Sequence, residues 1–176
     1  MKKLIATLLT LAMLLAVPCA LAEQVPAINW EDVEAQAAEI EGSWYTFDDV
    51  AVELWVPDVF ENLVVGEDDD ETMIGKFEIS DGSAGIYVAY IPGEVESIDQ
   101  AIETLEANGA KEIERCTLNG LDAVSYSMDG VDAQYVAFIT ESGNYLQFVF
   151  TPVSDEGLQA VAMLVTASIR PETTEG

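Results

Sequence analysis

The sequence predicts an α+β fold in which an antiparallel β-sheet of seven to eight strands is sandwiched between helices. Three observations predict it. Short strand-like segments follow one another and are joined by turn dipeptides, a pattern typical of antiparallel hairpins. The segments AGIYVAYI and YLQFVF are apolar on both alternations, which indicates a sheet covered on both faces. Three amphipathic segments provide the helices that would cover it.

The first residues have the three parts of a secretory signal peptide. Lys2 and Lys3 precede an apolar run, and Ala20-Leu21-Ala22 is a small-x-small cleavage site. The run is shorter than the roughly 20 residues that a membrane span needs. We therefore expect a signal peptide over residues 1–22 and a protein that is secreted or held at the cell envelope. Lipidation at Cys19 is the alternative, which Pro18 disfavours.

After cleavage, we expect a tether over residues 23–28, one domain over 29–171 and a disordered tail over 172–176. The segment NWEDVEAQAAEIEG predicts the first helix, capped by Asn29 and ended by Gly42. Its apolar stripe consists of Trp30, Val33, Ala37 and Ile40. The next segment, SWYTFDDVAVELWVPD, predicts two strands, and KFEISDGSAGIYVAYIPG predicts a hairpin.

The segment SIDQAIETLEANG predicts the second helix, with a capping box of Ser97 and Gln100 and with Gly109 at its end. Four strands are expected next, over 111–118, 121–128, 131–140 and 145–151. Asn119-Gly120 and Asp129-Gly130 are two-residue hairpin signals, so these strands are expected to be antiparallel neighbours.

The last helix is expected from about Asp155 to Ile169, with Ser154 as its cap and Pro171 beyond its end. These elements predict a core on both faces of the sheet. We expect buried side chains at Ile86, Val88, Phe138, Phe148 and Phe150. We expect the helical side chains of Ile102, Leu105, Val161 and Val165 to pack over them.

The order of these elements resembles that of the PsbP-like superfamily. The segments VELWVPDVF, SIDQAIETLEANGA, LNGLDAVSYSMDGVDAQYVAFITESGNYLQFVFTP and ASIRP carry the resemblance, which covers about Ser43 to Pro171. It implies an α/β/α sandwich and a binding role rather than catalysis. No functional residue transfers, since photosystem members of the group rely partly on histidine and this chain has none.

The composition excludes several function classes. The net charge of −27, with 33 acidic and 6 basic residues, disfavours nucleic acid and anionic lipid as partners. Because the chain has no histidine, Ser-His and Cys-His nucleophiles and histidine-ligated metals are excluded. After signal cleavage Cys116 is the one cysteine, and we interpret it as a small buried side chain. Ser125 and Ser127 have no base motif near them and are interpreted as strand residues.

An acidic run offers a candidate metal site. It consists of Glu67, Asp68, Asp69, Asp70 and Glu71. The run does not match a calcium loop of the EF-hand type, because Met73 and Ile79 stand where glycine and a bidentate Glu are required. We interpret it as a solvated loop, and a loose, low-affinity calcium site is the alternative.

Aromatic residues offer a candidate ligand groove. Trp44, Tyr45 and Trp55, together with Trp30 and Phe47, could line it, although aromatic residues at this spacing more often belong to a core. The sequence therefore favours an exported, non-catalytic binding or accessory domain for a protein or small-molecule ligand, without a cofactor. The alternatives are a hydrolase-type enzyme with carboxylates in an apolar groove, and a calcium-dependent surface interaction protein.

Overall fold

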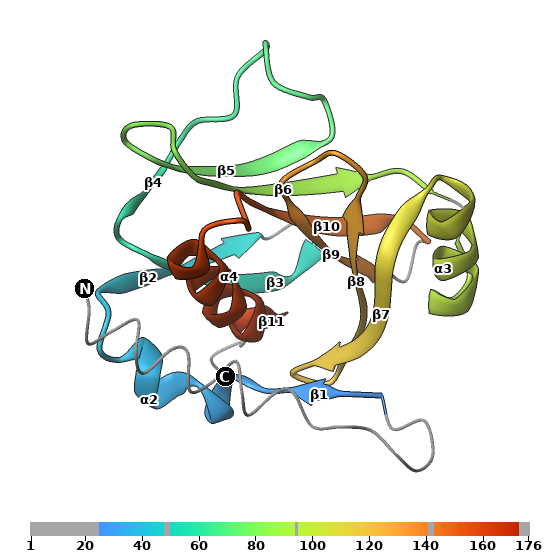
Figure 1. The fold of residues 1–176 in the computed structure, drawn as a ribbon, viewed down its shortest axis with the longest axis horizontal. Helices are drawn as coiled ribbons and strands as arrows, with labels where there is room; N and C mark the ends of the chain where they lie inside the picture. The colour runs from blue at the N-terminus through green and yellow to red at the C-terminus, as the bar shows by residue number, and fades with distance from the viewer. Residues whose placement is uncertain (1–24, 48–49, 94, 141–142, 173–176) are drawn as a thin grey trace.

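The computed structural model describes residues 25–47, 50–93, 95–140 and 143–172. The predicted signal peptide and residues 173–176 of the predicted tail lie outside the described residues. Two sheets form the fold (Figure 1). The large sheet has eight strands in the order β1-β7-β8-β9-β10-β6-β5-β4, and the small sheet has three in the order β11-β3-β2.

The strands of the large sheet are β1 (Ala27–Ile28), β4 (Phe60–Asn62), β5 (Met73–Ile79), β6 (Gly85–Ile91), β7 (Ala110–Leu118), β8 (Leu121–Met128), β9 (Gln134–Ile139) and β10 (Tyr145–Thr151). Those of the small sheet are β2 (Gly42–Phe47), β3 (Val52–Pro57) and β11 (Arg170–Pro171). The helices are the 3-10 helix η1 (Trp30–Asp32), α2 (Glu34–Ala37), α3 (Ile98–Ala107) and α4 (Glu156–Ser168).

The strands β7 to β10 form the predicted antiparallel meander. At the β7–β8 turn, Asn119 and Gly120 both have positive φ values, 48° and 84°, as a primed hairpin turn requires. The other strand pairs are antiparallel as well, except that β1 pairs in parallel with β7. The antiparallel fold class predicted from the turn signals is therefore confirmed.

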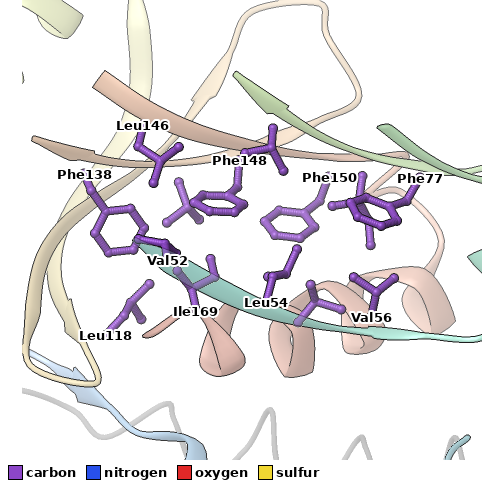
Figure 2. Close-up of a cluster of buried hydrophobic side chains, with 14 of the residues drawn as sticks. Val52, Leu54, Val56, Phe77, Leu118, Phe138, Leu146, Phe148, Phe150 and Ile169 are labelled. Atoms are coloured by element: carbon purple, nitrogen blue, oxygen red, sulfur yellow. The ribbon is translucent and has the colours of Figure 1, made fainter. Parts of the chain in front are cut away.

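The large sheet has an inner face, which packs against β3 and α4, and an outer face, part of which α3 covers. Figure 2 shows inner-face side chains of the large sheet, among them Phe148 and Phe150, pointing toward Leu54 and Val56 of β3. Each of these four side chains is at most 2% exposed. Val165 of α4 and Ile169, the residue that follows α4, belong to the same cluster. The main core thus lies between the two sheets.

The predicted core residues Ile86, Val88, Phe138, Phe148 and Phe150 are all buried. The helical side chains that pack over these residues differ from the prediction. Val161 and Val165 do pack in this cluster, whereas Ile102 and Leu105 pack against a separate cluster on the outer face. An antiparallel strand sends alternate side chains to opposite faces, so one helix cannot reach residues of both.

The predicted first helix is not continuous, which corrects the expectation of a helix from Asn29 to Glu41. Only η1 and the single turn α2 form. Glu39 and Glu41 lie where the negative end of a longer helix would be, and no basic residue lies in the last turn. This segment also does not cover the sheet directly. Trp30, Val33 and Ala37 pack on the far side of α4 and β3, against Trp55, Leu164 and Ala167.

Three further differences concern strands and caps. The β2–β3 hairpin forms a separate sheet with β11, because its apolar side chains pack face to face with the large sheet. Part of the segment expected to be a tether is β1, which pairs with Thr117 and Leu118.

The cap of α4 is Asp155 and not Ser154. The Asp155 side chain accepts hydrogen bonds from the backbone N–H groups of Gly157 and Leu158. At α3, Ser97 is the cap as predicted.

Candidate ligand pocket

A pocket of about 390 Å³ lies between α4 and the inner face of β7, β8 and β9. Figure 1 shows the elements that line it, with α4 on one side, β7 and β8 on the other and β1 below them. The lining residues come from the β1 segment, η1 and the residue after it, β7 to β9, the β10–α4 loop and α4. They are Pro26, Ala27, Ile28, Asp32, Val33, Glu114, Arg115, Cys116, Ser125, Gln134, Val136, Val153, Gln159, Ala162, Met163, Thr166 and Ala167.

The pocket exists because of the residues that point inward from the strands. One row across the sheet runs through Val88, Phe148, Val136, Ser125 and Glu114. The row is apolar where β3 covers it and polar where it reaches β8 and β7. A polar or charged side chain cannot be buried cheaply under an apolar cover, so this end of the inner face is left open.

The polar side chains of the pocket have unused hydrogen-bonding capacity. The Gln134 amide nitrogen donates to the Ser125 hydroxyl at 2.8 Å and to the Tyr126 carbonyl at 3.0 Å. Among the described residues, no partner lies at the Gln134 carbonyl oxygen or at the Glu114 carboxylate, and Glu114 is exposed. The pocket therefore presents two oxygen acceptors to a bound molecule.

The Asn119 side chain connects two walls of the pocket. Its amide nitrogen donates to the carbonyl oxygens of Ala167 and Ile169, each at 2.8 Å, at the C-terminal end of α4. Its carbonyl oxygen accepts the backbone N–H of Trp30 at 2.7 Å. The turn residue predicted from the Asn-Gly dipeptide thus also holds η1 and α4 at fixed positions on either side of the pocket.

Asp132 fixes the rim of the pocket at the β10–α4 loop. Its carboxylate accepts the backbone N–H groups of Val153 and Ser154 at 3.0 and 2.8 Å, and the Ser154 hydroxyl. The hydrogen bond from Ser154 holds the pKa of the Asp132 carboxyl below its usual value. Ser154, expected as the helix cap, instead ties the loop to the β8–β9 connection.

Cys116 lies on the pocket wall with its side chain mostly buried. Burial, reinforced by the negative charges of Glu114 and Asp122, raises the pKa of the thiol to about 11. The thiol is therefore protonated at neutral pH, a state in which cysteine is a poor nucleophile. This environment agrees with the interpretation of Cys116 as a small buried side chain.

The acidic run lies in the loop before β5, away from the pocket lining. Two of its carboxylates have local partners. Asp69 accepts the N–H of Gly66 and pairs with Lys76, both at 2.8 Å, and Asp70 accepts the N–H and hydroxyl of Thr72. These hydrogen bonds lower the pKa of both carboxyls. The run's other carboxylates, Glu67, Asp68 and Glu71, are exposed.

Across residues 25–172, leaving out the positions that the structure does not describe, no group of three or more Cys, Asp or Glu side chains is arranged to hold a metal ion. In the same part of the chain, none of the helices has the length and apolar character that crossing a membrane requires.

The predicted aromatic groove residues lie on two faces of the small sheet. Trp44 and Trp55 are cross-strand partners on the face of the small sheet that points away from the large sheet. The rings of both contact the ring of Trp30. Tyr45 points the other way and contacts Phe77 edge to face at 4.8 Å. Trp55 is buried, and the Arg170 guanidinium lies 3.8 Å above the exposed ring of Trp44. None of the three residues lines the pocket described here.

The sequence interpretation missed the pocket residues Glu114, Gln134 and Met163. One signal could have found two of them. Glu114, Ser125 and Gln134 occupy strand positions whose neighbours two residues away, such as Cys116 and Val136, are buried. A polar residue on the apolar alternation of a strand marks either a sheet edge or a pocket.

Several solved structures are similar to this chain. The structure of PsbP (CyanoP) from the cyanobacterium Synechocystis aligns with a TM-score of 0.53 at 12% identity, covering 74% of this chain and 92% of that chain. A Bacteroides thetaiotaomicron protein aligns with a TM-score of 0.49 at 14% identity, covering 78% of this chain and 51% of that chain. The Ran-binding protein Mog1p of Saccharomyces cerevisiae aligns with a TM-score of 0.44 at 13% identity, covering 75% and 96%.

No family model and no curated protein matches the sequence. The likeness to PsbP concerns the fold alone, because the sequence identity is low. Together with the mostly antiparallel eight-stranded sheet and its covering elements, it confirms the fold that the order of elements predicted. The chain has a PsbP-like α+β fold.

Proposed function

We propose that the protein is an exported, non-catalytic binding domain that holds a small-molecule ligand between α4 and strands β7 to β9. The observation that carries the proposal is the pocket itself, about 390 Å³ in volume, with unpaired oxygen acceptors on an otherwise mostly apolar lining. This volume and this mixture of surfaces are typical of small-molecule sites. Export rests on the signal-like residues 1–22.

The chemistry of the pocket supports binding over catalysis. The chain has no histidine to act as a base, and the Cys116 thiol is protonated at neutral pH. Ser125 accepts a hydrogen bond from the Gln134 amide, which has no basic group to activate a hydroxyl. These features support a pocket that holds a molecule without transforming it.

The walls of the pocket support a preformed site. Asn119 joins η1 to the end of α4, and Asp132 joins the β10–α4 loop to the β8–β9 connection. A site whose walls are held by hydrogen bonds of the protein itself loses less conformational entropy on binding than a flexible one.

A thermal-shift screen of metabolites against the mature chain tests this function. A compound present at about 100 times its Kd stabilises by about 2.7 kcal/mol, which raises the Tm of a chain this size by about 5–10 °C. We expect at least one compound to do so. Met163→Trp, which places a larger side chain in the pocket, should abolish that shift.

Val64→Trp is the matched control, since it adds the same ring at a loop position that is 91% exposed. Gln159→Trp, at the exposed rim of the pocket, provides a second blocking variant in case Met163→Trp lowers the Tm by itself. Hits that shift all four proteins equally, or a screen without hits, would contradict the proposed function.

A further inference from the structure

The hydrogen-bonding groups of the pocket select the chemistry of the ligand. The Gln134 amide nitrogen already donates to the Ser125 hydroxyl and the Tyr126 carbonyl, so its carbonyl oxygen is the group that remains for a ligand. Glu114 lies directly opposite Ser125 in the β7–β8 register, about 5 Å away between Cβ atoms. An ionised carboxylate and an amide carbonyl both accept hydrogen bonds, so a group bound between these two oxygens has to be a donor.

The charges around the pocket favour a positively charged donor group. Asp32 and Glu114 both line it, and both are exposed. Arg115, the one cationic residue among the described residues of the lining, pairs instead with Asp99 and Asp122 at 3.0 and 3.3 Å. Its cross-strand partner, Val124, packs on the outer face with α3, so the Arg115 side chain lies on the opposite side of the sheet from the pocket.

The remaining lining residues indicate the shape and polarity of the rest of the ligand. The walls are aliphatic, with Ile28, Val33, Val136 and Met163 among them, and none of the described lining residues is aromatic. Quaternary ammonium groups, which carry no N–H, are recognised by aromatic cages. An ammonium that still carries N–H groups can instead donate to Glu114 and Gln134.

We propose that the pocket binds a primary organic ammonium, with its charged nitrogen between Glu114 and Gln134 and a short aliphatic body along α4. This inference rests on the proposed function, because it names the ligand class of the same pocket. The acidic surface of the chain, with a net charge of −27, adds a long-range attraction for cations that raises their association rate.

Four probes of equal chain length separate the features of this ligand. Hexylamine has the charge and the N–H groups, hexyltrimethylammonium has the charge alone, hexanol is neutral, and hexanoate is an anion. Calorimetric titrations of the mature chain at matched ionic strength measure the Kd of each. We expect hexylamine to bind at least about tenfold more tightly than the other three, as a charge-assisted hydrogen bond provides.

A matched pair of variants separates the pocket from the acidic surface. Glu114→Gln removes one negative charge inside the pocket, and Glu106→Gln removes one from the exposed side of α3 on the other face. We expect Glu114→Gln to weaken hexylamine binding about tenfold and Glu106→Gln to leave it within about twofold. Met163→Trp should abolish binding, whereas Val64→Trp should not.

Each other outcome has a definite meaning. If hexanoate, hexanol or hexyltrimethylammonium binds most tightly and Met163→Trp blocks it, the pocket functions in binding but the ammonium assignment is wrong. Equal weakening by Glu114→Gln and Glu106→Gln would place hexylamine on the acidic surface and overturn the inference. If none of the four probes binds and the metabolite screen gives no hit, both the ammonium inference and the proposed function are wrong.

Discussion

The two ends of the inner face of the large sheet differ in the side chains that point inward from the strands. Where β10 and β6 run, the face carries Phe148, Phe150 and Ile86, and β3 packs against them. On β7 and β8 the same face carries core residues such as Leu118 and Ala123, but also Glu114 and Ser125, and a pocket remains between these two and α4. Strand pairing joins the two ends without a gap, from β6 through β10, β9 and β8 to β7.

This comparison shows that a few side chains decide which part of a sheet becomes core and which becomes a site. The backbone ladder is regular from β6 to β9, whereas the β7–β8 pairing shifts register between Lys111 and Glu114, so the open end differs in backbone as well as in side chains. Large apolar side chains gain free energy when a cover packs on them, whereas a carboxylate loses hydration under the same cover. The covered end should therefore determine stability, and the open end should determine binding.

The largest expected effect is at the covered end. Phe148 is fully buried, so Phe148→Ala should lower the free energy of unfolding by about 3–5 kcal/mol. Met163→Ala at the open end should cost about 1 kcal/mol, because its side chain already borders open space. Urea unfolding followed by circular dichroism measures both. Equal costs would contradict the distinction between the two ends.

The next effect concerns the connection between the pocket walls. Asn119→Gly keeps a residue that tolerates the positive φ of 48° but removes three hydrogen bonds, so we expect a loss of about 2–3 kcal/mol. Asp129→Gly, at an exposed position of the next hairpin turn, is the control and should stay within about 0.5 kcal/mol. Similar urea midpoints for the two variants would show that Asn119 does not hold the walls.

A smaller effect should appear in the pH dependence of stability. The folded-state pKa of Asp132 lies below its usual value of 3.8, chiefly because of Ser154. Its carboxylate therefore stabilises the fold above the unfolded-state pKa, and this contribution is lost as the pH falls through the folded-state pKa. Asp132→Asn should lower the urea midpoint at about pH 7 and should have less effect at about pH 3.

Asp129→Asn is the control for this titration, since it removes a carboxylate from an exposed turn of the same region. If Asp132→Asn lowers the midpoint by the same amount at both pH values, the carboxylate charge does not carry the interaction. The rim of the pocket would then depend on the shape of the side chain alone.

The smallest effect concerns the acidic run, which lies outside both ends of the inner face. Calcium and magnesium should each raise the Tm by about 2 °C or less, and equally, because screening of exposed charges is worth little. Neutralising the exposed members Glu67, Asp68 and Glu71 should reduce both shifts together. A saturable shift that is specific for calcium and is abolished by these changes would establish the alternative, a calcium site.

Much of the fold could be predicted from local signals. The dipeptide Asn119-Gly120 and the apolar strand segments predicted the β7–β10 meander, and Ser97 predicted the start of α3. The two-residue turn expected at Asp129-Gly130 is wrong in length, because the connection runs over residues 129–133 and β9 begins at Gln134 instead of Val131. The separation of β2 and β3 into a second sheet could not be predicted in this way. It depends on which faces pack together, and such long-range contacts leave no signal in a hairpin's own sequence.

The candidate site was harder to predict, because its residues are far apart in the chain. Glu114, Gln134 and Met163 come together only through the sheet register and the position of α4. The acidic run and the tryptophans are conspicuous in the sequence for their composition. The structure places the carboxylates of Asp69 and Asp70 in local turn contacts, and Trp55 in the packing around α4. Conspicuous composition and binding geometry are therefore separate properties of this chain.

One measurement tests the central claim most directly: a crystal structure of the mature chain soaked with hexylamine. The account predicts the ligand between α4 and β7–β9, with its nitrogen within hydrogen-bonding distance of the Glu114 carboxylate and the Gln134 carbonyl oxygen. The covered end of the inner face should be unchanged. A pocket that stays empty while hexylamine occupies the acidic surface, or that is filled by the protein's own side chains, would contradict the account.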